Sequence, residues 1–187
     1  DEPDYKVIKE YNDFELRYYS SYIVAETEVN DDFDDAGNIA HGILFDYISG
    51  NNSTREKIEM TVPVNQSNAG EKIEMTGPVS QSTKLNSRGK YTVSFVLPAR
   101  FTIETAPEPL NPRVNIREIP AKIMAVRKYS GSWSEENYRE NESLLIEKIN
   151  ENDLEGISDP VYARYNPPWW PWFLRRNEVQ VQVNYIE

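Results

Sequence analysis

Cysteine is absent from this chain of 187 residues, and histidine occurs once, as His41. Without thiols the protein forms neither a disulfide framework nor a thiolate metal site, and one imidazole is too few for the usual zinc sites with several histidines. The acidic run at 31–35 does not fit a calcium loop, because Ala36 stands where the EF-hand spacing needs a third oxygen ligand. We therefore expect no zinc or calcium site, and we expect the run to cap a helix.

Positive charge is scarce, and long apolar runs are missing. The chain has 20 Lys and Arg against 31 Asp and Glu, which gives a formal net charge of −11. Nucleic-acid binding requires clustered cations that release counterions from phosphates, so this acidity argues against it. No run approaches the roughly 20 apolar residues of a membrane span, and no signal-peptide pattern is present. The start at Asp1 is compatible with a cytoplasmic protein, which we favour, and with an exported mature form.

The common catalytic signatures are also missing. The chain has no Gly-x-Ser-x-Gly elbow, no glycine loop for phosphates, no dinucleotide fingerprint and no His-x-x-x-His pair. With no cysteine and one histidine, only carboxylates remain as candidate acids or bases. The sequence therefore favours a binding protein over an enzyme.

A repeated phrase stands at the centre of the chain. Residues 57–64 read KIEMTVPV and residues 72–79 read KIEMTGPV. Apolar and polar side chains alternate in both copies, with Ile58, Met60 and Val62 on one face, which predicts two half-buried strands. The polar stretch 65–70 predicts the turn of a β-hairpin between them.

The remaining elements follow from periodicity, caps and turn residues. Strands are expected at 5–11, 14–29, 91–97, 122–129, 161–165 and 179–186. Helices are expected at 33–48 and 134–150, the second opened by a capping box at 132–135. A proline-rich connector at 106–112 separates two strand-helix-strand-strand halves. This order predicts a pseudo-symmetric α+β domain with antiparallel pairing and both helices against one side of the sheet.

An aromatic segment at 165–176 holds three of the four tryptophans. Its prolines prevent it from continuing a strand, so it must form a loop that covers something. One interpretation is a plug that closes the end of the barrel. The other is a lid over a flat apolar ligand, on which indole rings stack. The candidate ligand-binding residues of this loop are Trp169, Trp170, Trp172, Phe173, Arg175 and Arg176.

These segments together resemble the SOUL haem-binding family. Both copies of the repeat fit the Lys-x-x-Met-Thr-x-Pro-Val element of that family, and other matches span nearly the whole chain. These matches lie at residues 5–8, 14–19, 44–51, 165–168 and 175–179. The resemblance implies one domain over 1–187 with halves at 5–98 and 113–187. It also implies a distorted antiparallel β-barrel flanked by two helices, akin to the small-molecule-binding domains of gyrase-inhibitor-like proteins and bacterial effector-binding regulators.

The resemblance implies haem or another porphyrin as a reversible ligand, in a hydrophobic groove between the first helix and the aromatic segment. Arg175 and Arg176 would contact the propionates at its rim. His41, as the only imidazole, is one candidate axial ligand. Some relatives have a histidine where this chain has Tyr18, whose phenolate is another candidate. The groove residues expected on the helix are His41, Leu44, Phe45 and Ile48.

Two other functions stay open on the sequence alone. A gyrase-inhibitor-like small-molecule sink or hydrolase would use a pocket glutamate and a tryptophan-lined wall. A protein-protein interaction module would use the aromatic segment as an exposed anchor. In the favoured interpretation the protein is a monomer whose partner is a small planar tetrapyrrole, without nucleic acid and without a membrane span.

Overall fold

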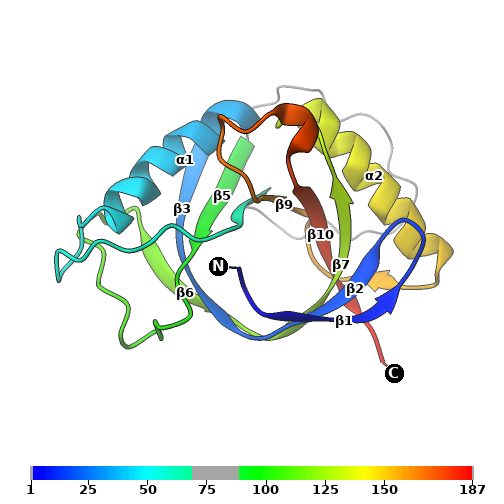
Figure 1. The fold of residues 1–187 in the computed structure, drawn as a ribbon, viewed down its shortest axis with the longest axis horizontal. Coiled ribbons are helices and arrows are strands. Elements are labelled where there is room, and N and C mark those ends of the chain that lie inside the picture. The colour runs from blue at the N-terminus through cyan, green and yellow to red at the C-terminus, as the bar shows by residue number, and fades with distance from the viewer. Residues whose placement is uncertain (1, 69–88, 187) are drawn as a thin grey trace.

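The described part of the chain forms one antiparallel sheet that curls into a half-barrel, with two helices on its outer side (Figure 1). The computed structural model describes residues 2–68 and 89–186. The strands are β1 (Tyr5–Glu10), β2 (Glu15–Tyr19), β3 (Tyr22–Asp31), β4 (Val64–Asn68), β5 (Gly89–Val96), β6 (Asn115–Ile119), β7 (Lys122–Tyr129), β8 (Glu155–Gly156), β9 (Val161–Arg164) and β10 (Asn177–Asn184). The helices are α1 (Phe33–Ile48), α2 (Glu135–Glu151) and the short 3-10 helix η1 (Trp172–Leu174).

The strand order is β1-β2-β7-β10-β9-β4-β5-β3-β6, and β8 pairs with β10. Two equivalent units are visible in this order, β3-α1-β4-β5 and β7-α2-β9-β10. They meet where β4 pairs with β9, with Val64 opposite Arg164. Helix α1 packs on β3 and β5, and α2 packs on β7 and β10. The predicted α+β architecture of two strand-helix-strand-strand halves is confirmed.

Phe33, the first residue of α1, links the two halves through aromatic contacts. Its ring stacks on Tyr138 of α2 with centroids 5.4 Å apart and on Tyr162 of β9 at 5.8 Å. It meets Tyr91 of β5 edge-on at 5.7 Å. Offset and edge-to-face pairs of this kind add to the stabilisation from apolar burial. Both helices are therefore fixed on the sheet through one shared aromatic cluster.

The helix boundaries follow from their caps. Asp32 accepts a hydrogen bond from the backbone N–H of Asp35 at 2.9 Å, so α1 begins at the predicted residue. In α2 the cap is Ser134, whose hydroxyl oxygen accepts from the N–H of Asn137 at 3.2 Å. The predicted capping box beginning at Ser132 is wrong, because the helix starts two residues later than that pattern requires.

The first copy of the repeat is a strand only at its last residue. Residues 57–63 lie outside the sheet, and Met60 is exposed, so the predicted alternation fails there. The segment is held by other contacts: the N–H of Ile58 donates to the carbonyl of Ile48 at 2.7 Å. The hydroxyl of Thr61 donates to the carbonyl of Val96. These bonds tie it to the end of α1 and to β5 instead of to a hairpin partner.

The predicted hairpin turn is wrong in its described part. Residues 65–68 belong to β4, which pairs with β5 along its whole length. The second copy of the repeat, 72–79, lies outside the described residues. The strand predicted over 14–29 is divided at residues 20 and 21 into β2, which pairs with β1 and β7, and β3, which pairs with β5 and β6. β6 was not predicted, because its side chains show no clear apolar alternation.

Candidate functional site

The loop at 166–176, named here the aromatic loop, carries large apolar side chains into solvent. Trp169 is 77% exposed, Trp172 is 61% exposed, and Phe173 and Leu174 are each 58% exposed. Trp170 is the least exposed of the five, at 37%. The interpretation of this segment as a buried plug is therefore wrong. Side chains of this size are seldom left exposed next to one another without a partner to cover them.

Arg175 holds this loop together from within. Its Nε donates to the carbonyl of Trp170 at 3.1 Å and its Nη2 donates to the carbonyl of Pro168 at 2.8 Å. The guanidinium also lies over the ring of Trp133, 4.3 Å from its centroid, in the segment before α2. The N–H of Gly131 donates to the carbonyl of Trp172 at 3.1 Å. The loop is thus fixed on the α2 side, and one edge of the Arg175 guanidinium is already engaged.

Arg176 is directed away from Arg175 and toward carboxylates. It forms ion pairs with Glu178 at 2.9 Å and with Glu2 at 3.0 Å, and it lies over the ring of Tyr165 at 3.8 Å. The two arginines proposed for one ligand rim therefore have different environments. Arg175 donates to carbonyls of the loop, whereas Arg176 pairs with the buried carboxylate of Glu178.

On α1, His41 and Phe45 are both exposed and their rings are nearly parallel, with centroids 6.0 Å apart. His41 also contacts the buried ring of Phe95 in β5, edge-on at 5.4 Å. Partial burial, assisted by the charge of Arg164, lowers the pKa of His41. A neutral imidazole is the form that binds metals. Leu44 and Ile48 are buried in the core beneath this surface.

Tyr18, the other candidate axial ligand, lies on β2 and is 45% exposed. Strand β2 pairs with β1 and β7, whereas His41 packs on β5 in the other half of the sheet. The structure therefore does not bring Tyr18 and His41 into one site.

A buried ion pair on β2 and β10 was not recognised from the sequence. Arg17 donates from Nη1 and Nη2 to the two carboxylate oxygens of Glu178, at 2.8 and 3.0 Å, and both side chains are 0% exposed. Its Nε donates at 2.6 Å to Glu15, which lies two residues earlier on the same strand. Gln180 donates to Glu178 at 3.0 Å and is itself buried.

The charges of this pair stabilise each other. Burial alone would raise the pKa of Glu178, but the hydrogen bonds and charge of Arg17, together with Arg176, lower it below the usual value. Burial would likewise lower the pKa of Arg17, and Glu178 raises it instead. Glu178 and Gln180 alternate along β10 with core valines, which places them on the sheet face opposite the helices. The sequence does not single out this pair, because Glu178 occupies one of the regular polar positions of the alternating strand β10.

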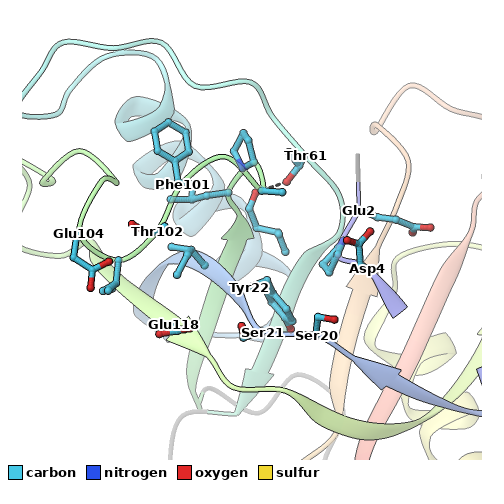
Figure 2. A pocket seen from close by; sticks show the side chains of 17 residues that line it. Glu2, Asp4, Ser20, Ser21, Tyr22, Thr61, Phe101, Thr102, Glu104 and Glu118 are labelled. Carbon is cyan, nitrogen blue, oxygen red and sulfur yellow. Dashed lines mark hydrogen bonds between the residues drawn. The ribbon is translucent and has the colours of Figure 1, made fainter. Parts of the chain in front are cut away.

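A cavity of about 630 Å³ opens on the concave side of the sheet near the N-terminal residues (Figure 1). Figure 2 shows Tyr22 on its floor and acidic side chains around it. Four carboxylates line it: Glu2, Asp4, Glu104 and Glu118. Residues 96–103 supply most of its apolar wall, and no Trp, Lys or Arg belongs to the described lining. The site thus has the pocket glutamates of the small-molecule alternative without its tryptophan wall.

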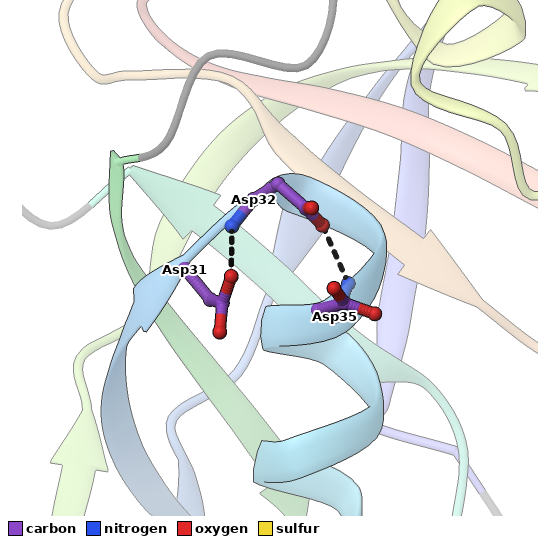
Figure 3. A group of neighbouring side chains, drawn as sticks. All are labelled: Asp31, Asp32 and Asp35. Atoms are coloured by element: carbon purple, nitrogen blue, oxygen red, sulfur yellow. Dashed lines mark hydrogen bonds between the residues drawn. The ribbon is translucent and has the colours of Figure 1, made fainter.

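A second acidic group, Asp31, Asp32 and Asp35, sits at the start of α1 (Figure 3). Asp31 accepts from the N–H of Asp32 at 2.9 Å, and Asp32 accepts from the N–H of Asp35. Repulsion by Asp32, with smaller effects of burial and Asp31, raises the pKa of Asp35. Two of these carboxylates thus serve the turn into the helix, which is the capping role that the sequence predicted.

Several solved structures share this fold at low sequence identity. The C-terminal domain of EcmrR is 13% identical, with a TM-score of 0.65 over 97% of this chain and 99% of that one. A hydrolase encoded by lin2189 from Listeria innocua is 11% identical, with a TM-score of 0.59 over 95% and 94% of the two chains. In an EcmrR–DNA complex the protein is 12% identical, with a TM-score of 0.65 over 91% of this chain but 57% of that one. Identities this low show a common fold only.

Within residues 2–68 and 89–186, no helix is long and apolar enough to cross a membrane. No curated protein matches the sequence significantly. The family model described as SOUL heme-binding protein matches residues 1–182. Since this match covers nearly the whole chain, and the fold is the two-helix half-barrel that the motifs implied, the chain belongs to the SOUL heme-binding protein family.

Proposed function

We propose that this protein binds haem or a related tetrapyrrole reversibly and without catalysis, in sequestration, buffering or transport. Family membership supports the ligand class. The observation that carries the site is the aromatic loop, where Trp169, Trp172 and Phe173 are more than half exposed. Flat apolar side chains in this number match the faces of a planar macrocycle.

The proposed groove lies between the aromatic loop and the exposed surface of α1. On the helix, the near-parallel rings of His41 and Phe45 offer a second flat surface. Bound haem would supply a conjugated macrocycle and an iron that accepts an axial ligand. The neutral imidazole of His41 is available for that role because its pKa is lowered. The free edge of Arg175 would contact a propionate, since its other edge is bonded to loop carbonyls.

A hemin titration tests this proposal. Saturable binding at micromolar protein should shift the Soret band and quench tryptophan fluorescence, because indoles lie in the site. Metal-free protoporphyrin should bind with similar affinity if stacking dominates over axial ligation. Absence of saturable binding of either porphyrin would overturn the proposed function.

A second candidate function rests on the concave cavity. Four carboxylates around an apolar wall suit a small ligand with an apolar body and a positive charge. The protein would then act as a small-molecule sink, or as a hydrolase with one of these carboxylates as general base.

A fluorescent lipophilic cation distinguishes the two candidates. Binding that is weakened by the double change Glu104→Gln and Glu118→Gln, while hemin affinity stays the same, would support the cavity as a separate site. Unchanged dye binding in this variant would exclude the cavity as the site that binds the dye.

A further inference from the structure

The outermost part of the aromatic loop, formed by Trp169, Trp172, Phe173 and Leu174 and named here the apolar tip, projects from the fold. The loop crosses the upper rim of the molecule beside the amino-terminal end of α2 (Figure 1). Trp169 contacts Trp170 edge-on at 5.8 Å, and Trp172 contacts Phe173 in the same way at 5.5 Å. These side chains therefore pack on each other in pairs while most of their surface faces solvent.

Much of the backbone of this loop is hydrogen-bonded within the protein. Pro167, Pro168 and Pro171 have no N–H to satisfy. Within residues 167–174 the hydrogen-bonded carbonyls are those of Pro167, Pro168, Trp170, Pro171, Trp172 and Leu174. Unpaired peptide groups strongly oppose transfer out of water. Internal pairing lowers that cost for these six carbonyls, so the loop can lie at the boundary of an apolar medium, where water still reaches its other peptide groups.

The base of the apolar tip is cationic. Arg175 has no carboxylate partner among the described residues, since its side chain donates to backbone carbonyls and its flat face covers Trp133. A second guanidinium, that of Arg164, lies 5.3 Å from the centroid of the same ring. The remainder of the chain is strongly acidic, so this local positive charge is distinctive. It complements the phosphate of a phospholipid headgroup.

We propose that the apolar tip docks on a phospholipid bilayer, inserting its rings at the boundary of headgroups and acyl chains while Arg175 meets the phosphates. Tryptophan, phenylalanine and leucine beside arginine is the composition that favours this boundary. A protein partner would usually supply hydrogen bonds to the loop it covers, and here six of the eight carbonyls in residues 167–174 are already bonded within the chain. This docking goes beyond the proposed tetrapyrrole binding and does not depend on it.

Flotation with phosphatidylcholine vesicles tests the proposal on the ligand-free protein. The wild type should float with the vesicles, and brominated lipid should quench its tryptophan fluorescence. The double variant Trp172→Ser/Phe173→Ser should have a vesicle partition coefficient at least about tenfold lower, because two exposed apolar side chains are lost. A matched control, Leu110→Ser/Ile157→Ser, removes exposed apolar side chains elsewhere and should float like the wild type.

Two results would overturn the docking. One is a wild type that does not float, or floats no better than the tip variant. The other is a wild type that sediments as a dimer without binding vesicles while the tip variant sediments as a monomer, which would make the tip a self-interface. Hemin titration of the same variants without lipid reads the tetrapyrrole site separately, so a failure of one proposal leaves the other measurable.

Discussion

The aromatic loop and the Arg17–Glu178 pair are close in sequence and opposite in environment. Leu174 is 58% exposed, and four residues later Glu178 is fully buried. The loop places apolar groups in water, whereas the pair places charges in the interior. The buried charges are matched atom by atom, so they belong to the stability of the fold. The exposed rings bury little surface in the fold, so their exposure points to a ligand or a docking surface that covers them.

Removal of the Glu178 carboxylate from the buried ion pair should have the largest effect. Glu178→Gln removes the fully buried carboxylate that bonds both terminal nitrogens of Arg17 and leaves the guanidinium with the partly exposed Glu15 as its remaining carboxylate partner among the described residues. Breaking a buried pair from one side costs about 3–5 kcal/mol, and the free energy of unfolding in urea should fall by that amount. Glu26→Gln, which breaks the more exposed pair with Arg117, should cost about 1 kcal/mol or less. Equal losses in the two variants would contradict the assigned role of the pair.

Acid should reproduce this loss in the wild type. The pKa of Glu178 is lower in the folded protein than in the unfolded chain, so its stabilisation is complete above the unfolded value and disappears as pH falls through the folded value. Stability should therefore decrease below about pH 4.3, the ordinary glutamate pKa. Glu178→Gln should show a shallower decrease in urea titrations over the same range, since that group no longer titrates.

On the exposed side, the expected effect is on binding and not on stability. Trp169→Ser with Trp170→Ser should weaken hemin binding by on the order of 2–3 kcal/mol, roughly 30–150-fold, because stacked indole surface is lost. The free energy of unfolding should change by less than the free energy of binding, since Trp169 is 77% exposed and Trp170, at 37%, bonds to the carbonyl of Leu174 within the loop. Leu110→Ser is the matched control, another exposed apolar residue, and should alter neither quantity. A large loss of stability with unchanged hemin affinity would show that these two indoles support the fold and do not contact the ligand.

Arg175 lies in sequence between the exposed rings and the buried Glu178. Its substitution should have a smaller effect on hemin affinity. Arg175→Gln keeps a donor for the loop carbonyls but removes the charge. The ratio of affinities for hemin and its dimethyl ester should fall by about threefold to fivefold, as expected for one partly solvated ion pair. Because any loosening of the loop affects both ligands, the ratio isolates the propionate contact. An unchanged ratio would remove Arg175 from the proposed site.

The sequence predicted the elements whose signals are local. Helix α1 was correct at both ends because Asp32 caps one end and Gly50, with a positive φ of 122°, follows the other. β7 was also correct in its bounds. The hairpin predicted for the repeat was wrong in its described part, because an alternating pattern of apolar and polar residues does not by itself imply pairing in a sheet. Residues 57–63 have the alternation of a strand, yet long-range bonds to α1 and β5 fix them outside the sheet.

The site was predictable in composition and not in arrangement. The aromatic loop was identified from its prolines and tryptophans, but its exposure was not, because the same residues suit a plug and a lid. Arg175 and Arg176 looked equivalent in sequence, and only the fold separates the loop brace from the partner of Glu178. The Arg17–Glu178 pair depends on β2 and β10 both flanking β7, a contact across 161 residues. No local sequence pattern predicts this pair.

The smallest expected effect concerns His41, which shares features of both regions. Its ring is exposed like the loop, but it rests on Phe95 of the core and burial lowers its pKa. If the ligand is held mainly by apolar stacking, His41→Ala should weaken hemin binding by less than about threefold, since isolated histidines seldom bind metal without an orienting partner. Wild type and variant should also share the same pH dependence of affinity between pH 7 and pH 5. An axial imidazole would give a different result, because protonation below its lowered pKa would release the iron in the wild type alone. Abolition of the Soret shift by His41→Ala, with normal binding in the double tryptophan variant, would make His41 the main ligand and refute the stacking model.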